Sequence, residues 1–232
     1  MTPLRIVTAG DATLVVEFDD RISVEVNARV IALAEQMRAL DIRGVRDIVA
    51  TFRSVAVYFD PLVVDAATLA QELRREASSP STPTDALANH LDVPVCYDPS
   101  FGLDLDVVAQ RAGLDAETVI SIHAGCAYRV FMLGFIPGFA YMGTVDERIA
   151  IPRLETPRLH VPAGSVAIAG EQTGIYPSQT PGGWRIIGRT PLRTWRPDAP
   201  RPTLFRAGDT VRFRRIDRNE FDRLAAAPEC AA

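Results

Sequence analysis

Short apolar runs alternate with stretches of helical period in the first part of the chain. Between Val26 and Leu40, apolar residues recur every three or four positions, which predicts a helix with one buried face, and Gly44 follows as a stop signal. Asp65 is placed to cap a second helix. The expected elements are strands over 4–9, 13–18, 45–52 and 54–59 and helices over 23–40 and 66–77. Their order, β-β-α-β-β-α, predicts a small α+β domain over residues 1–85.

A stretch without periodicity separates this domain from the rest of the chain. Residues 78–85 are rich in Ser, Thr and Pro, which predicts a linker. A strand is expected over 91–97. It is followed by a helical lead-in over 101–125 that breaks at Gly113 into two short helices.

After residue 125 the chain loses its helical period. Short apolar runs alternate with Gly and Pro turns, and nine of the 17 prolines lie between 152 and 202. That density excludes long helices, because proline lacks a backbone donor and clashes inside a helix. The pattern predicts a closed or sandwich-like β-domain over 86–232, ending in a short helix over 217–227.

Lysine is absent from the sequence, so all 25 basic residues other than histidine are arginine. The absence excludes a P-loop lysine and any Schiff-base mechanism in this chain. With 47% hydrophobic residues and a net charge of -4, the composition is otherwise that of an ordinary soluble globular protein.

Charge is distributed unevenly along the sequence. Residues 1–150 carry 12 Arg against 21 Asp and Glu, whereas residues 151–218 carry 12 Arg against 5 Asp and Glu. The basic later part favours an anionic ligand or an acidic partner. Alternatively, its arginines simply balance the acidic domain. We expect no nucleic-acid partner, because the chain has no helix-turn-helix signal, aromatic RNA-binding motif or basic run.

The cysteines and histidines are too scattered to form a metal site by their spacing, and we expect none. They are Cys96, Cys126, Cys230, His90, His123 and His160. An odd cysteine count argues against a secreted disulfide scaffold. No apolar run approaches the ~20 residues that span a membrane, and the N-terminus does not resemble a leader. We therefore expect a cytoplasmic protein with no membrane partner.

The segment 132–143 combines glycines and aromatic residues more densely than core packing requires. Glycines allow close backbone approach, and aromatic rings supply rigid contact area. We expect its exposed apolar side chains to form a partner interface. The residues assigned to it are Phe135, Pro137, Phe139 and Tyr141.

Two Pro-Arg pairs follow, five residues apart. Because proline stiffens the backbone, we expect Arg153 and Arg158 to form a preset clamp for a carboxylate or phosphate. Two exposed salt bridges are the alternative. The next Gly- and Pro-rich segment carries Tyr176, Gln179 and Trp184. No nucleophile elbow or glycine-rich nucleotide motif occurs.

Four motifs at fixed spacing resemble one family. They are GFIPGFAY at 134–141, PRLETPR at 152–158, VPAGSVAIAG at 161–170 and YPSQTPGGWRIIGRTP at 176–191. The family is that of allophanate hydrolase subunit 1, also known as the family of KipI and of the 5-oxoprolinase B subunit, and is related to the carboxyltransferase region of urea carboxylase. The resemblance extends across the whole chain. It departs at 49–59, where the family typically has a proline near the strand start and then an aromatic residue.

The resemblance implies a cyclophilin-like β-barrel after the small α+β domain. It also implies an enzyme that opens 5-oxoproline to glutamate at the expense of ATP, with Mg expected. The enzyme would include a C-type subunit, which carries another cyclophilin-like domain, and a third, A-type subunit. This chain and the C-type protein would form a heterodimer or a heterotetramer, and the chain alone would be inactive.

The same resemblance suggests roles for the residues singled out above. Arg153 and Arg158 would hold the small anionic substrate, and the three side chains of the later motif would position it: Tyr176, Gln179 and Trp184. His123 is the nominated acid or base, because histidine has a near-neutral reference pKa of about 6.5.

Two other functions stay open from the sequence. One is an amide-hydrolysing component of the allophanate hydrolase or urea carboxylase type. The other is a binding protein without catalysis that inhibits a histidine kinase, its aromatic loop docking a partner helix. Neighbouring genes for C-type and A-type subunits would favour the enzyme, and a neighbouring kinase gene would favour the inhibitor.

The linker generates the first testable prediction. Limited proteolysis is expected to cut first within 78–85, because this segment lacks apolar periodicity and contains two prolines. Mass spectrometry of the fragments locates the cut. Initial cleavage inside 125–216 with an intact linker would overturn the predicted boundary.

Overall fold

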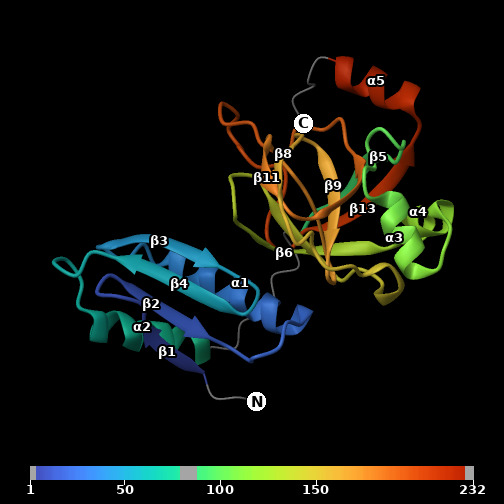
Figure 1. Ribbon diagram of the computed structural model, residues 1–232. Helices are drawn as coiled ribbons and strands as arrows, with labels where there is room; N and C mark the ends of the chain where they lie inside the picture. The colour runs from blue at the N-terminus through green and yellow to red at the C-terminus, as the bar shows by residue number, and fades with distance from the viewer. Residues whose placement is uncertain (1–3, 79–87, 228–232) are drawn as a thin grey trace. The chain divides into compact units, whose positions relative to one another are not determined.

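The chain folds into two compact units, Met1–Ala88 and Asn89–Ala232. The computed structural model describes residues 4–78 and 88–227 (Figure 1). The predicted linker over 78–85 lies outside the described residues except for Ser78, the last residue of a helix. Within the described ranges, no helix has the length and apolar character needed to cross a membrane.

The first unit is a four-stranded antiparallel sheet with two helices packed against it. The elements are β1 (Arg5–Thr8), β2 (Thr13–Glu17), α1 (Val24–Ala39), β3 (Val45–Ala50), β4 (Ser54–Phe59) and α2 (Ala66–Ser78). The strands lie in the order β1-β2-β4-β3. Each predicted element of this unit is confirmed to within about two residues at its ends.

Strand alternation and a helix cap build the core of this unit. Val16 in β2 and Val57 in β4 are fully buried, whereas the residues beside them are partly exposed, as expected for a sheet covered on one face. The Ser23 hydroxyl accepts the backbone N–H of Val26 at 3.1 Å and so starts α1. Leu40, assigned to the buried face, is instead 40% exposed, because it is the C-cap residue beyond the last helical turn.

The second unit is a closed β-barrel with the strand order β10-β7-β6-β13-β5-β12-β9. The strands are β5 (His90–Cys96), β6 (Ala127–Leu133), β7 (Ala140–Gly143), β9 (Ser165–Ala169), β10 (Gln172–Ile175), β12 (Arg185–Arg189) and β13 (Thr210–Ile216). β5 and β13 run parallel, and the other neighbouring pairs are antiparallel. The predicted α+β fold with a β-barrel as its later part is confirmed.

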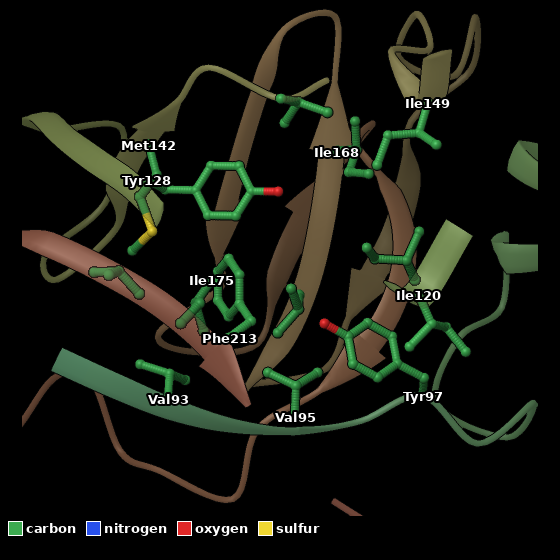
Figure 2. Packing of buried hydrophobic residues seen from close by; sticks show 14 of the residues in the cluster. Val93, Val95, Tyr97, Ile120, Tyr128, Met142, Ile149, Ile168, Ile175 and Phe213 are labelled. Atoms are coloured by element: carbon green, nitrogen blue, oxygen red, sulfur yellow. The ribbon is translucent and has the colours of Figure 1, made fainter. Parts of the chain in front are cut away.

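Inward-facing side chains fill the barrel, as Figure 2 shows for Val93 and Val95 of β5 and Phe213 of β13. The predicted helical lead-in forms α3 (Leu105–Ala112) and α4 (Ala116–Gly125), which add apolar residues to the same cluster. Gly113 ends α3 in the left-handed conformation, with φ of 67°, as glycine does without steric cost. The Asp115 carboxylate accepts the N–H of Thr118 and caps α4.

Smaller elements lie outside the barrel wall. A separate antiparallel pair joins β8 (Arg158–Val161) to β11 (Thr180–Gly182), and a short 3-10 helix, η2, spans Glu147–Ile149. β8 begins at the second Pro-Arg pair, and β11 runs into the Pro-Gly-Gly turn. Their pairing therefore brings these two sequence motifs to one side of the barrel.

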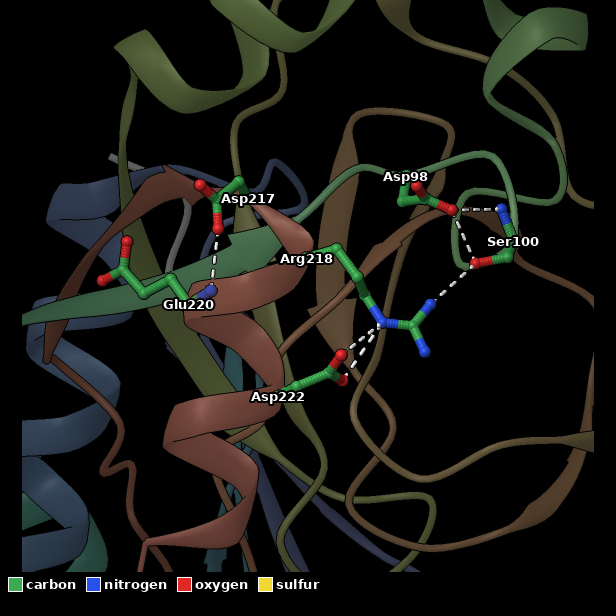
Figure 3. A network of polar contacts seen from close by, with 6 residues as sticks. All are labelled: Asp98, Ser100, Asp217, Arg218, Glu220 and Asp222. Atoms are coloured by element: carbon green, nitrogen blue, oxygen red, sulfur yellow. Dashed lines mark hydrogen bonds and ion pairs between the residues drawn. The ribbon is translucent and has the colours of Figure 1, made fainter.

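Helix α5 (Arg218–Ala226) is tied to the loop after β5 by a polar network (Figure 3). The Asp217 carboxylate accepts the N–H of Glu220 at 2.7 Å and caps the helix. Arg218 donates to Asp222 at 3.1 Å and to the Ser100 hydroxyl at 3.3 Å. The predicted last helix over 217–227 is confirmed, and it contacts the loop around Ser100 as well as β5 and β13.

Candidate functional site

A cleft of about 480 Å³ opens on the outer side of the barrel wall. Met142 and Ile175 point into the barrel, so their chain neighbours Tyr141 and Tyr176 face outward and line the cleft. The complete lining is Phe135, Phe139, Tyr141, Arg153, Leu154, Glu155, Pro157, Tyr176, Pro181, Gly182, Gly183 and Trp184. The cleft thus gathers residues from three of the four sequence motifs.

Phe139 organises the aromatic floor of the cleft. Its ring lies edge-on to four others, with centroids 4.9 Å away for Tyr141, 5.3 Å for Tyr176, 5.4 Å for Trp184 and 5.6 Å for Phe135. Edge-to-face pairs at these separations are attractive because the positive ring edge meets the negative ring face. The floor is therefore a rigid apolar platform.

The residues assigned to a partner interface differ in their exposure to solvent. Phe139 is only 1% exposed and belongs to the buried aromatic cluster, which corrects its assignment to a free surface. Tyr141 is half-buried in the cleft. Phe135, in the cleft lining, is 59% exposed, and Pro137 is exposed outside the lining, so both present apolar surface to solvent.

Two glycines allow the aromatic rings to lie directly on the backbone. A Cβ at Gly174 would sit 2.9 Å from the Ala140 carbonyl oxygen and 3.1 Å from the Phe139 ring. A Cβ at Gly182 would sit 2.7 Å from the Tyr176 ring. At each position the nearest atom would be too close to a real Cβ, so the aromatic floor requires glycine at 174 and 182.

The loop 152–157 forms a second wall of the cleft. The Leu154 N–H donates to the Gly183 carbonyl at 2.6 Å, and the Arg185 Nε donates to the Pro152 carbonyl at 3.4 Å. These bonds hold the exposed side chains of Arg153 and Glu155 beside the aromatic floor. Arg153 is thus placed where the sequence predicted, at the edge of a cleft.

Arg158 has a different environment from Arg153. Its Nη2 donates to the Asp104 carboxylate at 2.8 Å, and the Asp104 side chain is 5% exposed. Arg158 does not line the cleft, whereas its neighbour Pro157 does. This corrects the expected two-arginine clamp, because an internal carboxylate already holds one of the two guanidinium groups.

Tyr176 and Trp184 lie together in the cleft, as the sequence predicted. Burial raises the pKa of Tyr176 above its usual value, and the residue is 2% exposed. The hydroxyl therefore stays protonated at neutral pH. Gln179, grouped with these two from the sequence, is instead exposed away from the cleft lining, with its Nε2 3.4 Å from Nδ1 of His160.

His123 lies inside the barrel and has no solvent exposure. Its Nδ1 is 2.8 Å from the Tyr97 hydroxyl, and its Nε2 is 3.0 Å from Oγ1 of Thr173. Because the Thr173 hydroxyl donates to the Ala167 carbonyl, it accepts from a protonated Nε2, and Nδ1 accepts from Tyr97. These contacts fix one neutral tautomer.

Burial determines the ionisation of His123. Desolvation lowers its pKa from 6.5 to about 3, so the ring is neutral at physiological pH. The ring also stacks on Phe213 with centroids 4.6 Å apart and is absent from the cleft lining. The structure therefore corrects the expectation of an acid or base near the cleft and makes His123 a satisfied core residue.

The described parts of the chain do not gather three or more His, Cys, Asp or Glu side chains in one place that could hold a metal ion. The cationic side chain in the cleft lining is Arg153, and the tyrosine hydroxyls and backbone groups beside it can form hydrogen bonds. These groups suit a small ligand that has one anionic part and one flat apolar face.

Sequence reasoning missed Asp104 and the two platform glycines. Asp104 precedes a helix and therefore looks like an ordinary N-cap residue, yet its side chain makes no capping bond. Its partner Arg158 lies 54 residues away in the sequence. The Gly-Gly pair at 182–183 was a recognisable signal, but its closeness to the Tyr176 ring depends on the folded chain.

Comparisons with known proteins agree with this architecture. A family model described as carboxyltransferase domain, subdomain C and D, matches residues 4–205. The chain is 38% identical over 222 residues to a protein of Bacillus subtilis (strain 168) that is named as the B subunit of 5-oxoprolinase. The match covers 91% of this chain and 92% of that protein.

Two solved structures share the fold. The crystal structure of TTHA0988 is 36% identical with a TM-score of 0.80, and the match covers 88% of this chain but 40% of that one. This chain therefore spans about two fifths of the TTHA0988 chain. The urea carboxylase of Kluyveromyces lactis is 20% identical with a TM-score of 0.78, covering 95% of this chain and 22% of that one, and it shows the fold alone.

The buried histidine generates a prediction about pH. Between pH 6.5 and about 3 the unfolded chain binds a proton that the folded barrel excludes, so stability is full above this window and falls as the pH drops through it. The expected slope is at most about 1.4 kcal/mol per pH unit. When the free energy of unfolding is measured with denaturant from pH 7.5 to 4.5, it should depend less steeply on pH in His123→Gln than in the wild type. A pH dependence in His123→Gln equal to that of the wild type would contradict the assignment.

Proposed function

The chain belongs to the carboxyltransferase domain family, subdomains C and D, and on this basis we propose that it is the B subunit of a 5-oxoprolinase. The observation that carries the proposal is the extent of the similarity to the Bacillus subtilis protein, which covers nine tenths of both chains. Such coverage includes both the α+β unit and the barrel with its cleft. The chain is accordingly one component of a hydrolase complex.

The chemistry of the cleft supports this proposal. 5-Oxoproline is a small five-membered lactam that carries one carboxylate. Its ring offers a flat face to the aromatic floor, and Arg153 offers a bidentate partner to its carboxylate. The protonated Tyr176 hydroxyl can donate to the lactam oxygen. These three contacts would orient the ring and stabilise negative charge that develops on that oxygen.

Ring opening adds water across the lactam C–N bond and yields the amine and the second carboxylate of glutamate. We propose that ATP would drive this step by transferring its γ-phosphoryl group to the lactam oxygen, leaving ADP. Water would then add to the ring carbon and the C–N bond would break, giving the free amine and an acyl phosphate. A second water would hydrolyse the acyl phosphate to the carboxylate of glutamate and inorganic phosphate. Because the chain has no lysine, any lysine contact to ATP must come from a partner protein. We assign ATP and its Mg to the assembled complex, and this chain is expected to be inactive alone.

The partners follow from the same proposal. A cyclophilin-like protein of the C type and a protein of the A type would complete the enzyme. The TTHA0988 chain is more than twice the length that this chain covers, which is consistent with a further region beside the similar one. The exposed Phe135 and Pro137 are the surface we assign to the C-type partner.

Coexpression with neighbouring genes for the C-type and A-type partners tests the proposed function. The assembled complex should release glutamate from 5-oxoproline only when ATP is present, and this chain alone should release none. Turnover of allophanate in place of 5-oxoproline would support the urea carboxylase type of activity instead. Binding to a histidine kinase without turnover would overturn the enzymatic proposal.

Arg153 generates a prediction about catalysis. Arg153→Lys keeps the charge but loses the bidentate fork, so kcat/KM of the complex should fall roughly ten- to hundred-fold if the partner covers the cleft. Arg214→Lys is the matched control, because Arg214 is an exposed arginine whose ion pair with Glu220 lies outside the cleft lining. Near-full activity of Arg153→Lys would show that the substrate does not contact this guanidinium.

Phe135 generates a prediction about assembly. Phe135→Ser removes an exposed ring at the proposed interface, so the Kd for the C-type partner should rise by about 30-fold or more, as for an aromatic anchor worth about 2 kcal/mol. Leu62→Ser is the matched control, because Leu62 is 95% exposed in the other unit. Unchanged affinity in Phe135→Ser, measured by calorimetry, would place the interface elsewhere.

A further inference from the structure

The buried carboxylate of Asp104 lies outside the cleft and connects two strands that adjoin the walls of the cleft. Asp104 is 3% exposed and directly precedes α3. Its carboxylate contacts β8, which follows loop 152–157, and β12, which follows the cleft residues 181–184. We infer that Asp104 is the positioning residue of the cleft, holding loop 152–157 and with it Arg153 in the ligand-binding arrangement. The inference rests on the proposed function of the cleft.

The two oxygens of Asp104 have separate tasks. Oδ2 accepts the Ile186 backbone N–H at 2.7 Å, while the Asp104 backbone N–H donates to the Ile186 carbonyl at 2.7 Å. Oδ1 accepts Nη2 of Arg158 at 2.8 Å, and Nη1 of Arg185 lies 3.8 Å from it. The Asp104 carboxylate thus bonds to the backbone of β12 through Oδ2 and to the Arg158 side chain of β8 through Oδ1, and so connects the two strands.

These bonds close a ring of contacts between loop 152–157 and segment 183–186. Arg158 follows Pro157, a cleft residue, and Ile186 follows Trp184 by two positions. On the far side of the ring, the Leu154 N–H donates to the Gly183 carbonyl at 2.6 Å. Loop 152–157 is therefore fixed at Leu154 and just beyond its C-terminal end, with Arg153 next to the first of these points.

The negative charge of Asp104 is needed for this arrangement. The Arg158 side chain is 28% exposed, but its Nη1 atom is buried and has no hydrogen-bond partner. The contact of Nη2 with the buried Asp104 carboxylate is therefore the charge-assisted bond that holds this guanidinium. An asparagine at 104 could still accept the Ile186 N–H, but it would no longer neutralise the two arginines. The change would therefore remove the ion pair that links β8 to β12, while the pairing of β8 with β11 and the backbone bond to Ile186 would remain.

Hydrogen exchange of the full chain tests the inference without any ligand or partner. In Asp104→Asn, exchange of the Leu154 amide, which donates to the Gly183 carbonyl, should quicken about ten-fold or more, the scale of a lost charge-assisted bond. Exchange in β5 and β13 should stay at the wild-type rate. Glu220→Gln is the matched control, because it breaks the exposed pair with Arg214 and should leave exchange of the Leu154 amide unchanged.

A second variant, Arg158→Gln, tests the same contact if Asp104→Asn does not fold. Arg158→Gln keeps the Asp104–Ile186 bonds and should quicken exchange of the same amide. The double variant should add little to either single change, because both remove one interaction. Wild-type exchange of the Leu154 amide in folded Arg158→Gln, or equal quickening throughout the barrel, would overturn the inference.

Activity of the assembled complex gives the second readout. With wild-type turnover of 5-oxoproline established, Asp104→Asn should lower kcat/KM about ten-fold or more through a misplaced Arg153, and Glu220→Gln should not. Quickened exchange in a complex whose wild type does not turn over 5-oxoproline would refute the proposed function while leaving the positioning role supported. Quickened exchange with unchanged turnover would refute the positioning role in the reaction.

Discussion

Alternation of side chains across the closed barrel wall is the constraint on which the site depends. On β7 and β10 the inward residues, such as Met142 and Ile175, complete the barrel core. The outward residues on and just beyond these strands, Tyr141 and Tyr176, belong to the aromatic cluster of the cleft. One set of strands therefore builds two separate environments, a sealed core and an open cleft, and a residue's place in the pleat decides which chemistry is open to it.

Two buried polar groups show the consequence of that division. His123 is sealed inside the barrel, where desolvation lowers its pKa to about 3 and two hydroxyl groups satisfy its ring nitrogens. Asp104 is almost as deeply buried, but it lies among arginines and a backbone donor that compensate a carboxylate. The first group stabilises the core, and the second connects the elements that form the cleft walls. Burial alone did not distinguish their roles, whereas their partners did.

Much of the fold followed from local patterns. The strand at 54–59 coincides with β4, and Asp115 caps α4, because alternation and capping depend on neighbouring residues. Arg153, Tyr176 and Trp184, which the Gly- and Pro-rich motifs singled out, lie in one cleft. A signal for the burial of His123 was also present, since it follows Val119 by four residues and Ile120 by three on one helical face. The pairing of Asp104 with Arg158 had no such signal, because only the closed barrel brings α3 and β8 together.

The central claim is that the outer aromatic cleft, and not the barrel interior, binds the substrate. A crystal structure of the assembled complex with 5-oxoproline bound tests this claim most directly. The account predicts the lactam ring within about 4 Å of Trp184 and Tyr176, with its carboxylate on Arg153. Electron density for the ligand elsewhere, with partner side chains filling the cleft, would contradict the account.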